Sequence, residues 1–276
     1  MQTLTDKGSF FRELHHKEKA FIIPNPWDVG TARILVGLGF QALATTSAGY
    51  AMSLGRRDGE VDREAMIAHV AAIADATNAP VSADLQNGFG DRPEDAAECI
   101  RLAGQAGAVG GSIEDATGRD DEPIYDKGYA AERVRAAVEA ARALPFPFTL
   151  TARAENYLYD RPNLKDTIER LQAYQEAGAD VLYAPGLRTR DDIQEVVRSV
   201  DRPVNMLMAG MGIDLNLAEL SGLGVKRISV GSALSRFAMS AFVRAAREML
   251  TEGTFRFADS MIGSAEINAL LNRELR

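Results

Sequence analysis

Short apolar runs alternate with longer amphipathic runs along almost the whole chain. The short runs are rich in β-branched and small residues and lack a polar face, which is typical of strands buried on both sides. We therefore predict strands at 21–25, 42–47, 81–85, 110–114, 148–152, 181–184, 203–208 and 227–230. The longer runs place apolar residues three and four positions apart, as at Met66, Val70 and Ile73, which is the spacing of a helix with one buried face.

Predicted helices fill the intervals, and several of them end at a glycine, a common helix stop. They cover 9–19, 29–38, 63–77, 93–106, 130–143, 163–177, 191–200, 215–223 and 234–252, with further helix in 260–276. About eight strand–helix units within roughly 250 residues are typical of a (β/α)₈ TIM barrel. A doubly wound sheet is the alternative, but no phosphate-binding glycine loop follows the first strand. We predict one barrel domain over residues 1–276, with 237–276 as a C-terminal helical extension.

The stretch from Pro80 to Asp91, PVSADLQNGFGD, carries polar side chains where a buried strand ends. Asp84 and Gln86 lie two positions apart, so on a strand they point to the same side. A carboxylate in that place is costly unless a cation or hydrogen bonds satisfy it. The stretch therefore fits either a metal or substrate site or a capping aspartate in a strand-to-helix turn.

In a barrel, the carboxyl ends of the strands converge on one site. The ten polar residues at the predicted ends include four acids and one arginine. They are Asn25, Ser47, Asp84, Gln86, Glu114, Asp115, Arg153, Glu155, Asn205 and Ser232. Oxygen ligands without histidine or cysteine suit a hard cation such as Mg²⁺, with Mn²⁺ as a substitute, held largely through water. An arginine beside a cation points to a small anionic substrate.

Five residues have plain structural interpretations when each is taken alone. Arg153 either contacts an anionic substrate or pairs with a neighbouring glutamate. Asp58, in a glycine-flanked loop, is typical of a surface turn. The adjacent His15 and His16 lie among charges, and we expect both to be solvated. Cys99 is expected to be a small core residue rather than a nucleophile.

Composition narrows the class of protein. The chain has 31 Lys and Arg against 39 Asp and Glu, a net charge of −8, which argues against nucleic-acid and anionic-membrane partners. One cysteine allows no intrachain disulfide and fits a reducing compartment. The N-terminal segment lacks the apolar core of a secretory signal, and no apolar run approaches the ~18 residues of a membrane span. We expect a cytoplasmic protein.

Taken together, the motifs of the chain resemble the isocitrate lyase/phosphoenolpyruvate mutase superfamily, from about Pro24 to Leu234. The order and spacing carry the resemblance, since each motif is weak alone. The motifs are NPWDVGTARI, TTSAGYAMSLGRRDG, SADLQNGFGD, GGSIEDATG, LTARAEN, YQEAGADVLYAPGL, PVNMLM and KRISVGSAL. The resemblance implies a Mg²⁺-dependent (β/α)₈ enzyme whose reactions share an enolate of an α-oxo acid.

The resemblance also implies roles for single residues. A serine and glycine loop binds the oxo-acid end of the substrate in this superfamily, and Ser47, Ala48 and Gly49 match it. Together with the arginine and two further residues, the expected substrate contacts are Thr46, Ser47, Ala48, Gly49, Arg153 and Asn205. Acids that hold Mg²⁺ match Asp58, Asp84, Gln86 and Glu114. The arginine that grips the anionic group matches Arg153, and the catalytic residues are expected to be Ser47, Glu114 and Arg153.

The chain departs from the superfamily pattern in three places and resembles its phosphonomutase-like branch. Gln86 replaces the second acid of a paired-acid motif, so Mg²⁺ should bind more weakly. The loop ATGRDDEPIYDKG after Asp115 lacks the cysteine and histidine of the lyase gating loop. Pro185 stands where lyases carry a glutamate, and the mutase loop with its lysine is also missing. The proton donor is left open among Tyr50, Tyr125 and Tyr183.

We therefore expect a Mg²⁺-dependent lyase that cleaves a carbon–carbon bond in a small α-oxo or hydroxy (di)carboxylate. Isocitrate lyase-like cleavage and oxaloacetate decarboxylase-like chemistry both fit, and the latter needs no separate base. The alternatives are P–C bond chemistry on phosphonopyruvate or phosphoenolpyruvate, by a mutase or hydrolase, and a non-catalytic oxo-acid binding protein. Because the superfamily commonly swaps its last barrel helix, the resemblance also implies a homo-oligomer, a tetramer in preference to a dimer, with 237–276 exchanged between subunits.

Overall fold

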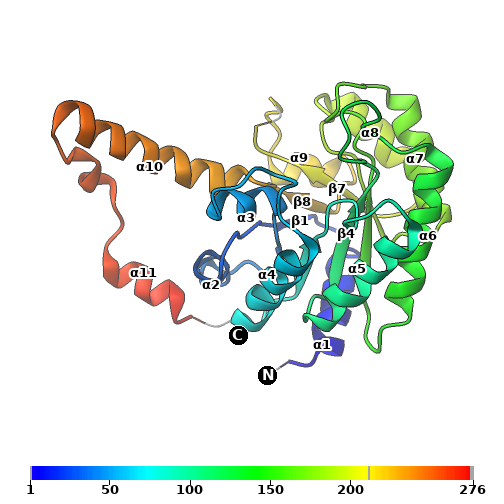
Figure 1. Ribbon diagram of the computed structural model, residues 1–276, viewed down its shortest axis with the longest axis horizontal. Helices are drawn as coiled ribbons and strands as arrows, with labels where there is room; N and C mark the ends of the chain where they lie inside the picture. Colours follow the sequence, from blue (N-terminus) through cyan, green and yellow to red (C-terminus); the bar gives the residue numbers. More distant parts are fainter. Residues whose placement is uncertain (1, 211, 274–276) are drawn as a thin grey trace.

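The computed structural model describes residues 2–210 and 212–273, which contain a barrel of eight parallel strands (Figure 1). In space the strands run β1-β8-β7-β6-β5-β4-β3-β2. The ends of this order meet where the Ala44 N–H donates to the Pro24 carbonyl oxygen at 3.1 Å. The strands are β1 (Phe21–Ile23), β2 (Leu43–Ala44), β3 (Val81–Asp84), β4 (Gly110–Glu114), β5 (Thr149–Arg153), β6 (Val181–Tyr183), β7 (Val204–Leu207) and β8 (Arg227–Ser229). The predicted (β/α)₈ barrel is confirmed.

Helices connect the strands around the outside of the barrel, mostly where the apolar spacing predicts them. They are α1 (Leu4–Leu14), α2 (Val29–Leu38), α3 (Ser47–Ser53), α4 (Arg63–Ala76), α5 (Pro93–Gln105), α6 (Lys127–Arg142), α7 (Leu164–Glu176), α8 (Arg190–Arg198) and α9 (Leu217–Gly222). The predicted start of the first helix is wrong, because Thr3 and Asp6 form a capping box that begins α1 earlier. Helix α3 replaces the end of the predicted strand 42–47, because the Thr46 hydroxyl accepts a hydrogen bond from the Gly49 N–H and caps a helix there.

The two faces of the strands differ in chemistry. Outward residues such as Ile113, Leu150 and Leu182 belong to the apolar cluster that packs between the strands and the helices. Inward residues are often small and polar. Alternate positions supply the inward pairs Ser82 with Asp84, Ser112 with Glu114, and Arg227 with Ser229. Barrel interiors are usually filled by Val, Ile and Leu, so these small residues leave a hollow that opens at the carboxyl ends of the strands.

Helix α1 lies against the amino end of the barrel, and this overturns the prediction for His15. Phe11 and Leu14 of α1 share an apolar cluster with Ile23 of β1. Their packing carries the next residue, His15, inward, where it is only 2% exposed and makes edge contacts with Phe11 and Phe21. His16 is exposed as predicted. Cys99 is fully buried in the core, also as predicted.

The chain after the barrel forms a C-terminal arm, defined here as residues 237–273. It contains most of the long helix α10 (Ala233–Glu252), the 3₁₀ turn η1 (Arg256–Ser260) and α11 (Ser264–Leu271). Figure 1 shows α10, in orange, leading away from the barrel before the chain returns. At the return, α11 packs on α2 so closely that a Cβ at Gly37 would meet the Leu270 carbonyl oxygen. Among the residues that the structure describes, no helix is both long and apolar enough to span a membrane.

Candidate active site

A cavity of about 350 Å³ opens at the carboxyl ends of the strands, where the sequence places the site. The predicted site residues found in its wall are Thr46, Ser47, Ala48, Asp58, Asp84, Gln86, Glu114, Arg153 and Asn205. Asn25, Glu155 and Ser232, predicted as strand-end residues, also line it. Gly49 lies behind this wall. A Cβ there would come 2.6 Å from Thr46 Cγ2 and 3.0 Å from Ser235 Oγ, so glycine permits the close packing of α3.

The serine loop is held against β3 by two hydrogen bonds. The Ser47 N–H donates to Asp84 Oδ2 at 2.9 Å, and the Asp84 N–H donates to Thr45 Oγ1 at 2.8 Å. Ser47 is also the first residue of α3, where helix N–H groups favour negative charge. The loop and the central aspartate are therefore fixed relative to one another before any ligand binds.

Arg153 lies in the middle of three carboxylates. Its Nη1 is 3.1 Å from both Asp84 Oδ1 and Glu114 Oε2, and its Nε donates to Glu155 Oε1 at 2.8 Å. The guanidinium also lies over the Tyr183 ring, 5.2 Å from its centroid. In the protein without ligand, Arg153 thus pairs with neighbouring carboxylates, which is one of the two interpretations that the sequence allows. Within the described ranges 2–210 and 212–273, no hydrogen bond engages Nη2, so that nitrogen is available to a ligand.

The cavity holds an excess of negative charge. Among the described residues that line it, Asp58, Asp84, Glu114 and Glu155 are acidic, whereas the only cations are Arg153 and Arg227. Burial raises the pKa of Glu114 well above its usual value, although the Arg153 charge opposes the shift. Burial and the neighbouring Asp84 likewise raise the pKa of Asp58. A bound cation would relieve this repulsion.

The donor set fits Mg²⁺ that keeps part of its water shell. The donors are hard oxygen groups, which Mg²⁺ prefers. Across the part of the chain that the structure describes, no three or more His, Cys, Asp or Glu side chains have the spacing of a direct metal site. Gln86 adds an amide rather than a charge, and its Nε2 donates to Asp58 Oδ1 at 3.1 Å. Asp58, Asp84, Gln86 and Glu114 are thus suited to hold a hydrated cation.

Asp115 supports the site without lining it. Its Oδ1 accepts the Glu155 N–H at 2.8 Å, and its Oδ2 accepts from Arg170 Nη1 at 3.0 Å and from the Tyr174 hydroxyl at 2.5 Å. The prediction that Asp115 faces the site with the other strand-end residues is therefore wrong. Three donors turn this carboxylate toward β5 and α7, where it fixes the backbone that carries Glu155.

Of the three tyrosines that the sequence offers as proton donors, one lines the cavity. Tyr183 lines the cavity, and burial raises its pKa to about 12, so its hydroxyl keeps its proton at neutral pH. Tyr50 instead stacks on His69 at 3.8 Å. Tyr125 donates its hydroxyl to Asp91 Oδ1 outside the cavity. Tyr159, which sequence reasoning missed, also lines the cavity.

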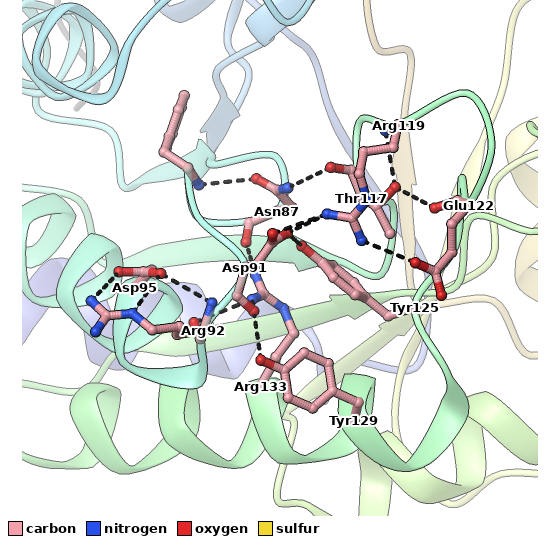
Figure 2. Close-up of polar contacts among 11 residues, drawn as sticks. Asn87, Asp91, Arg92, Asp95, Thr117, Arg119, Glu122, Tyr125, Tyr129 and Arg133 are labelled. Carbon is pink, nitrogen blue, oxygen red and sulfur yellow. Dashed lines mark hydrogen bonds and ion pairs between the residues drawn. The ribbon is translucent and has the colours of Figure 1, made fainter.

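A second network holds the turn that follows Gln86 (Figure 2). Arg133 of α6 donates to the carbonyl oxygens of Asn87 and Asp91, and its guanidinium lies over the Tyr125 ring. Arg119, from the loop after β4, binds both carboxylate oxygens of Asp91 at 2.8 and 3.0 Å. The loop that lacks the lyase cysteine and histidine is thereby tied to the loop that presents Gln86.

Sequence reasoning missed several residues that line the cavity. They are Thr45, Ser112, Tyr159, Arg227 and Ser229. Most of them lie on strands, two positions from another polar residue, within segments that are otherwise apolar. That alternation inside predicted barrel strands is the signal that could have revealed a polar interior.

A hollow (β/α)₈ barrel with an acid-rich cavity at the carboxyl ends of its strands has the architecture of a barrel enzyme. The family model for phosphoenolpyruvate phosphomutase matches residues 11–250. The chain therefore belongs to the phosphoenolpyruvate phosphomutase family, which confirms the resemblance seen in its motifs.

Two curated relatives match most of the chain. An uncharacterised protein of Mycobacterium tuberculosis is 34% identical over 239 residues, covering 86% of this chain and 87% of the relative. The 2,3-dimethylmalate lyase of Eubacterium barkeri is 28% identical over 277 residues, covering 95% and 93%. The second relative is named as a lyase.

Two solved structures share the fold. The crystal structure of an inferred lyase/mutase from Burkholderia cenocepacia is 57% identical, with a TM-score of 0.96 and 99% of each chain covered. A phosphonopyruvate hydrolase solved with oxalate and Mg²⁺ is 22% identical, with a TM-score of 0.84 and coverage of 96% and 94%. At that identity the second likeness shows the fold alone.

Proposed function

We propose that this protein is a Mg²⁺-dependent lyase that breaks a carbon–carbon bond in a small α-oxo or hydroxy (di)carboxylate. The observation that carries the proposal is one cavity in which the serine loop, the cluster around Asp84 and the Arg153 guanidinium meet. Family membership and the relative named 2,3-dimethylmalate lyase support it. Both isocitrate lyase-like cleavage and oxaloacetate decarboxylase-like chemistry fit this cavity.

Asp58, Asp84, Gln86 and Glu114 would hold the cation. When bound, Mg²⁺ supplies a Lewis acid beside the position where negative charge develops on the oxo group. The phosphonopyruvate hydrolase of the same fold, solved with oxalate and Mg²⁺, is consistent with this assignment.

The protein's own groups then bind and orient the substrate. The Ser47 hydroxyl and the start of α3 receive the oxo-acid end, with Thr46, Ala48 and Gly49 shaping the loop. Arg153 offers Nη2 to an anionic group while its other nitrogens stay paired. Tyr183 is positioned to donate a proton to the product, and Leu158 and Tyr159 at the mouth of the cavity exclude water.

Two alternatives stay in the proposal. P–C bond chemistry on phosphonopyruvate or phosphoenolpyruvate is favoured by the name of the family model. A non-catalytic oxo-acid binding protein is favoured by Gln86, which supplies no charge to a cation. The same experiment separates all three.

The test is a panel of oxo and hydroxy acids that includes oxaloacetate and phosphonopyruvate, incubated with Mg²⁺ or with EDTA. We expect release of a smaller oxo acid such as pyruvate in Mg²⁺ only. Asp84→Ala should abolish this release and the metal-dependent binding, whereas Asp191→Ala, on exposed α8, should change neither. Phosphate release from phosphonopyruvate, by a hydrolase, or its conversion to phosphoenolpyruvate, by a mutase, would establish the P–C alternative. Binding without any product would establish the binding protein.

The proposal extends to assembly and location. The C-terminal arm exposes apolar side chains on α10, while α11 packs on α2 of the same chain. We therefore propose that 237–276 packs on a neighbouring subunit through α10 in a homo-oligomer, a dimer or tetramer. A cytoplasmic location fits the single cysteine, which is buried and unpaired by any disulfide.

A further inference from the structure

Arg227 is a buried cation whose observed partners are all neutral. It begins β8, points into the barrel and is 5% exposed. Its Nε donates to Asn205 Oδ1 at 2.8 Å and its Nη2 to Thr151 Oγ1 at 2.9 Å. Its Nη1 lies 3.4 Å from His15 Nε2. Within 2–210 and 212–273, it forms no salt bridge with a carboxylate.

The contrast with Arg153 makes this arrangement unusual. Arg153, whose side chain is 15% exposed, is paired with three carboxylates, whereas Arg227 is more deeply buried and has none among the described residues. Burial lowers the pKa of Arg227 to about 10, so the guanidinium still carries its charge at neutral pH. A buried charge held only by neutral groups is costly. Asn205 and Thr151 could be braced by a neutral side chain without that cost, so bracing alone does not explain an arginine.

Arg227 lines the cavity below the level of Arg153. It lines the same cavity as Ser47 and Asp84. Its partner Thr151 precedes Arg153 by two residues on β5, which corresponds to about 6.6 Å along the strand. Hydroxyl groups of Ser82, Ser112 and Ser229 line the cavity as well and can donate to a carboxylate.

We propose that Arg227 binds the far carboxylate of a dicarboxylate substrate that lies along the barrel axis, with its reacting end at Ser47 and Asp84. This inference rests on the proposed function and narrows its substrate class to dicarboxylates. The cavity of about 350 Å³ suits such a ligand, because ligand pockets run from roughly 300 to 1,000 Å³. Two N–H groups of the guanidinium are left by the three contacts above, enough for a carboxylate.

The experiment compares two ligands that differ only at the far end. Malate and 2-hydroxybutyrate share a four-carbon skeleton, but the latter ends in a methyl group. Calorimetry in Mg²⁺ should show malate binding to the wild type more tightly by roughly 10- to 100-fold, the scale of a charge-assisted hydrogen bond. Arg227→Gln should remove most of that preference and leave 2-hydroxybutyrate affinity within about threefold.

Two further variants keep the test decisive. Arg227→Lys, which keeps the charge but loses the planar fork, should retain part of the preference. Arg198→Gln, on the exposed surface of α8, should retain all of it. If Arg227→Gln does not fold, the measurement passes to Arg227→Lys, and an unchanged preference there overturns the inference.

The outcomes separate this inference from the proposed function. If the wild type binds both acids and Arg227→Gln weakens both equally or neither, Arg227 is only a structural brace and the dicarboxylate inference is wrong. If the wild type binds neither acid, the proposed function itself fails, and the inference fails with it.

Discussion

The active-site cavity and the C-terminal arm depart from the usual burial of residues in opposite directions. The cavity buries charge, since Glu155 is 2% and Arg227 is 5% exposed and the Arg153 side chain is 15% exposed. The arm exposes large apolar side chains, since Phe237 is 71% and Leu250 is 86% exposed. Folded proteins normally pair buried charges and bury large apolar groups. Both departures agree with our proposals, in which the cavity receives a small ion and ligand and the arm receives the surface of a neighbouring subunit.

The arm should give the largest effect when its proposed contact with a neighbouring subunit is removed. Phe237 and Phe242 on α10 are 71% and 69% exposed, so replacing both with Asp should leave the fold of one chain intact. The same change places charges in the proposed subunit interface. We expect light scattering at micromolar concentration to show an oligomer for the wild type and a monomer for Phe237→Asp/Phe242→Asp.

Leu217→Asp is the matched control for this test. Leu217 is 42% exposed but lies on α9, outside the arm, so its replacement should leave the mass unchanged. A wild type that is already a monomer would contradict both the interface and the proposed exchange of residues 237–276.

Arg153→Lys probes the cavity side of the comparison. A lysine keeps one charge but cannot reach Asp84, Glu114 and Glu155 together while offering a further N–H to a ligand. We expect ligand binding to weaken by roughly 1–3 kcal/mol, measured by calorimetry. The unfolding temperature without ligand should also fall, because at least one buried carboxylate loses its partner. Unchanged affinity beside a lowered unfolding temperature would make Arg153 a structural ion-pair residue only.

Particular elements show how far sequence carries in this fold. The strands and most helices follow from apolar spacing, and their number predicts the barrel. Apolar spacing does not predict helix α3, because the helix has only seven residues and its start depends on the Thr46 cap. The burial of His15 is not predicted either, because it results from the packing of α1 across the amino end of the barrel. Its charged neighbours in sequence indicate exposure instead.

The site divides in the same way. Topology brings Ser47, Asp84, Glu114 and Arg153 together, because the carboxyl ends of all barrel strands meet. Topology does not predict which side chains from lower in the strands also reach the cavity. Arg227 starts its strand, so it belongs by sequence to the wrong end of the barrel, and it reaches the cavity only because the interior residues beside it are small.

His15 offers a pH test of the buried polar interior. Burial, with the Arg227 charge, lowers the pKa of His15 to about 3 in the folded protein, whereas an unfolded histidine titrates near about 6.5. Between these values the unfolded state binds the extra proton, so the free energy of unfolding falls as the pH falls. At pH 5 the loss from this residue is about 2 kcal/mol.

His15→Phe removes that titration and keeps an aromatic ring against Phe11 and Phe21. Urea unfolding at pH 7 and pH 5 should therefore show a smaller loss of stability on acidification for the variant than for the wild type. The comparison with wild type is needed because Glu114 and Glu155, whose pKa values are raised by burial, contribute with the opposite sign. An equal loss in both proteins would show that His15 accepts a proton while folded.

Gln86→Glu should give the smallest effect, and it is the most specific test of what the cavity lacks. The added carboxylate replaces the amide that donates to Asp58, so without metal it brings two like charges together. With Mg²⁺ the same charge attracts the cation through water, and the dissociation constant should fall by roughly three- to tenfold. The unfolding temperature should accordingly drop in EDTA and rise in saturating Mg²⁺, whereas Gln105→Glu, on the exposed end of α5, should alter neither. If Gln86→Glu instead weakens Mg²⁺ binding, the amide is a required neutral group, and the excess negative charge of the cavity is not there to hold a cation.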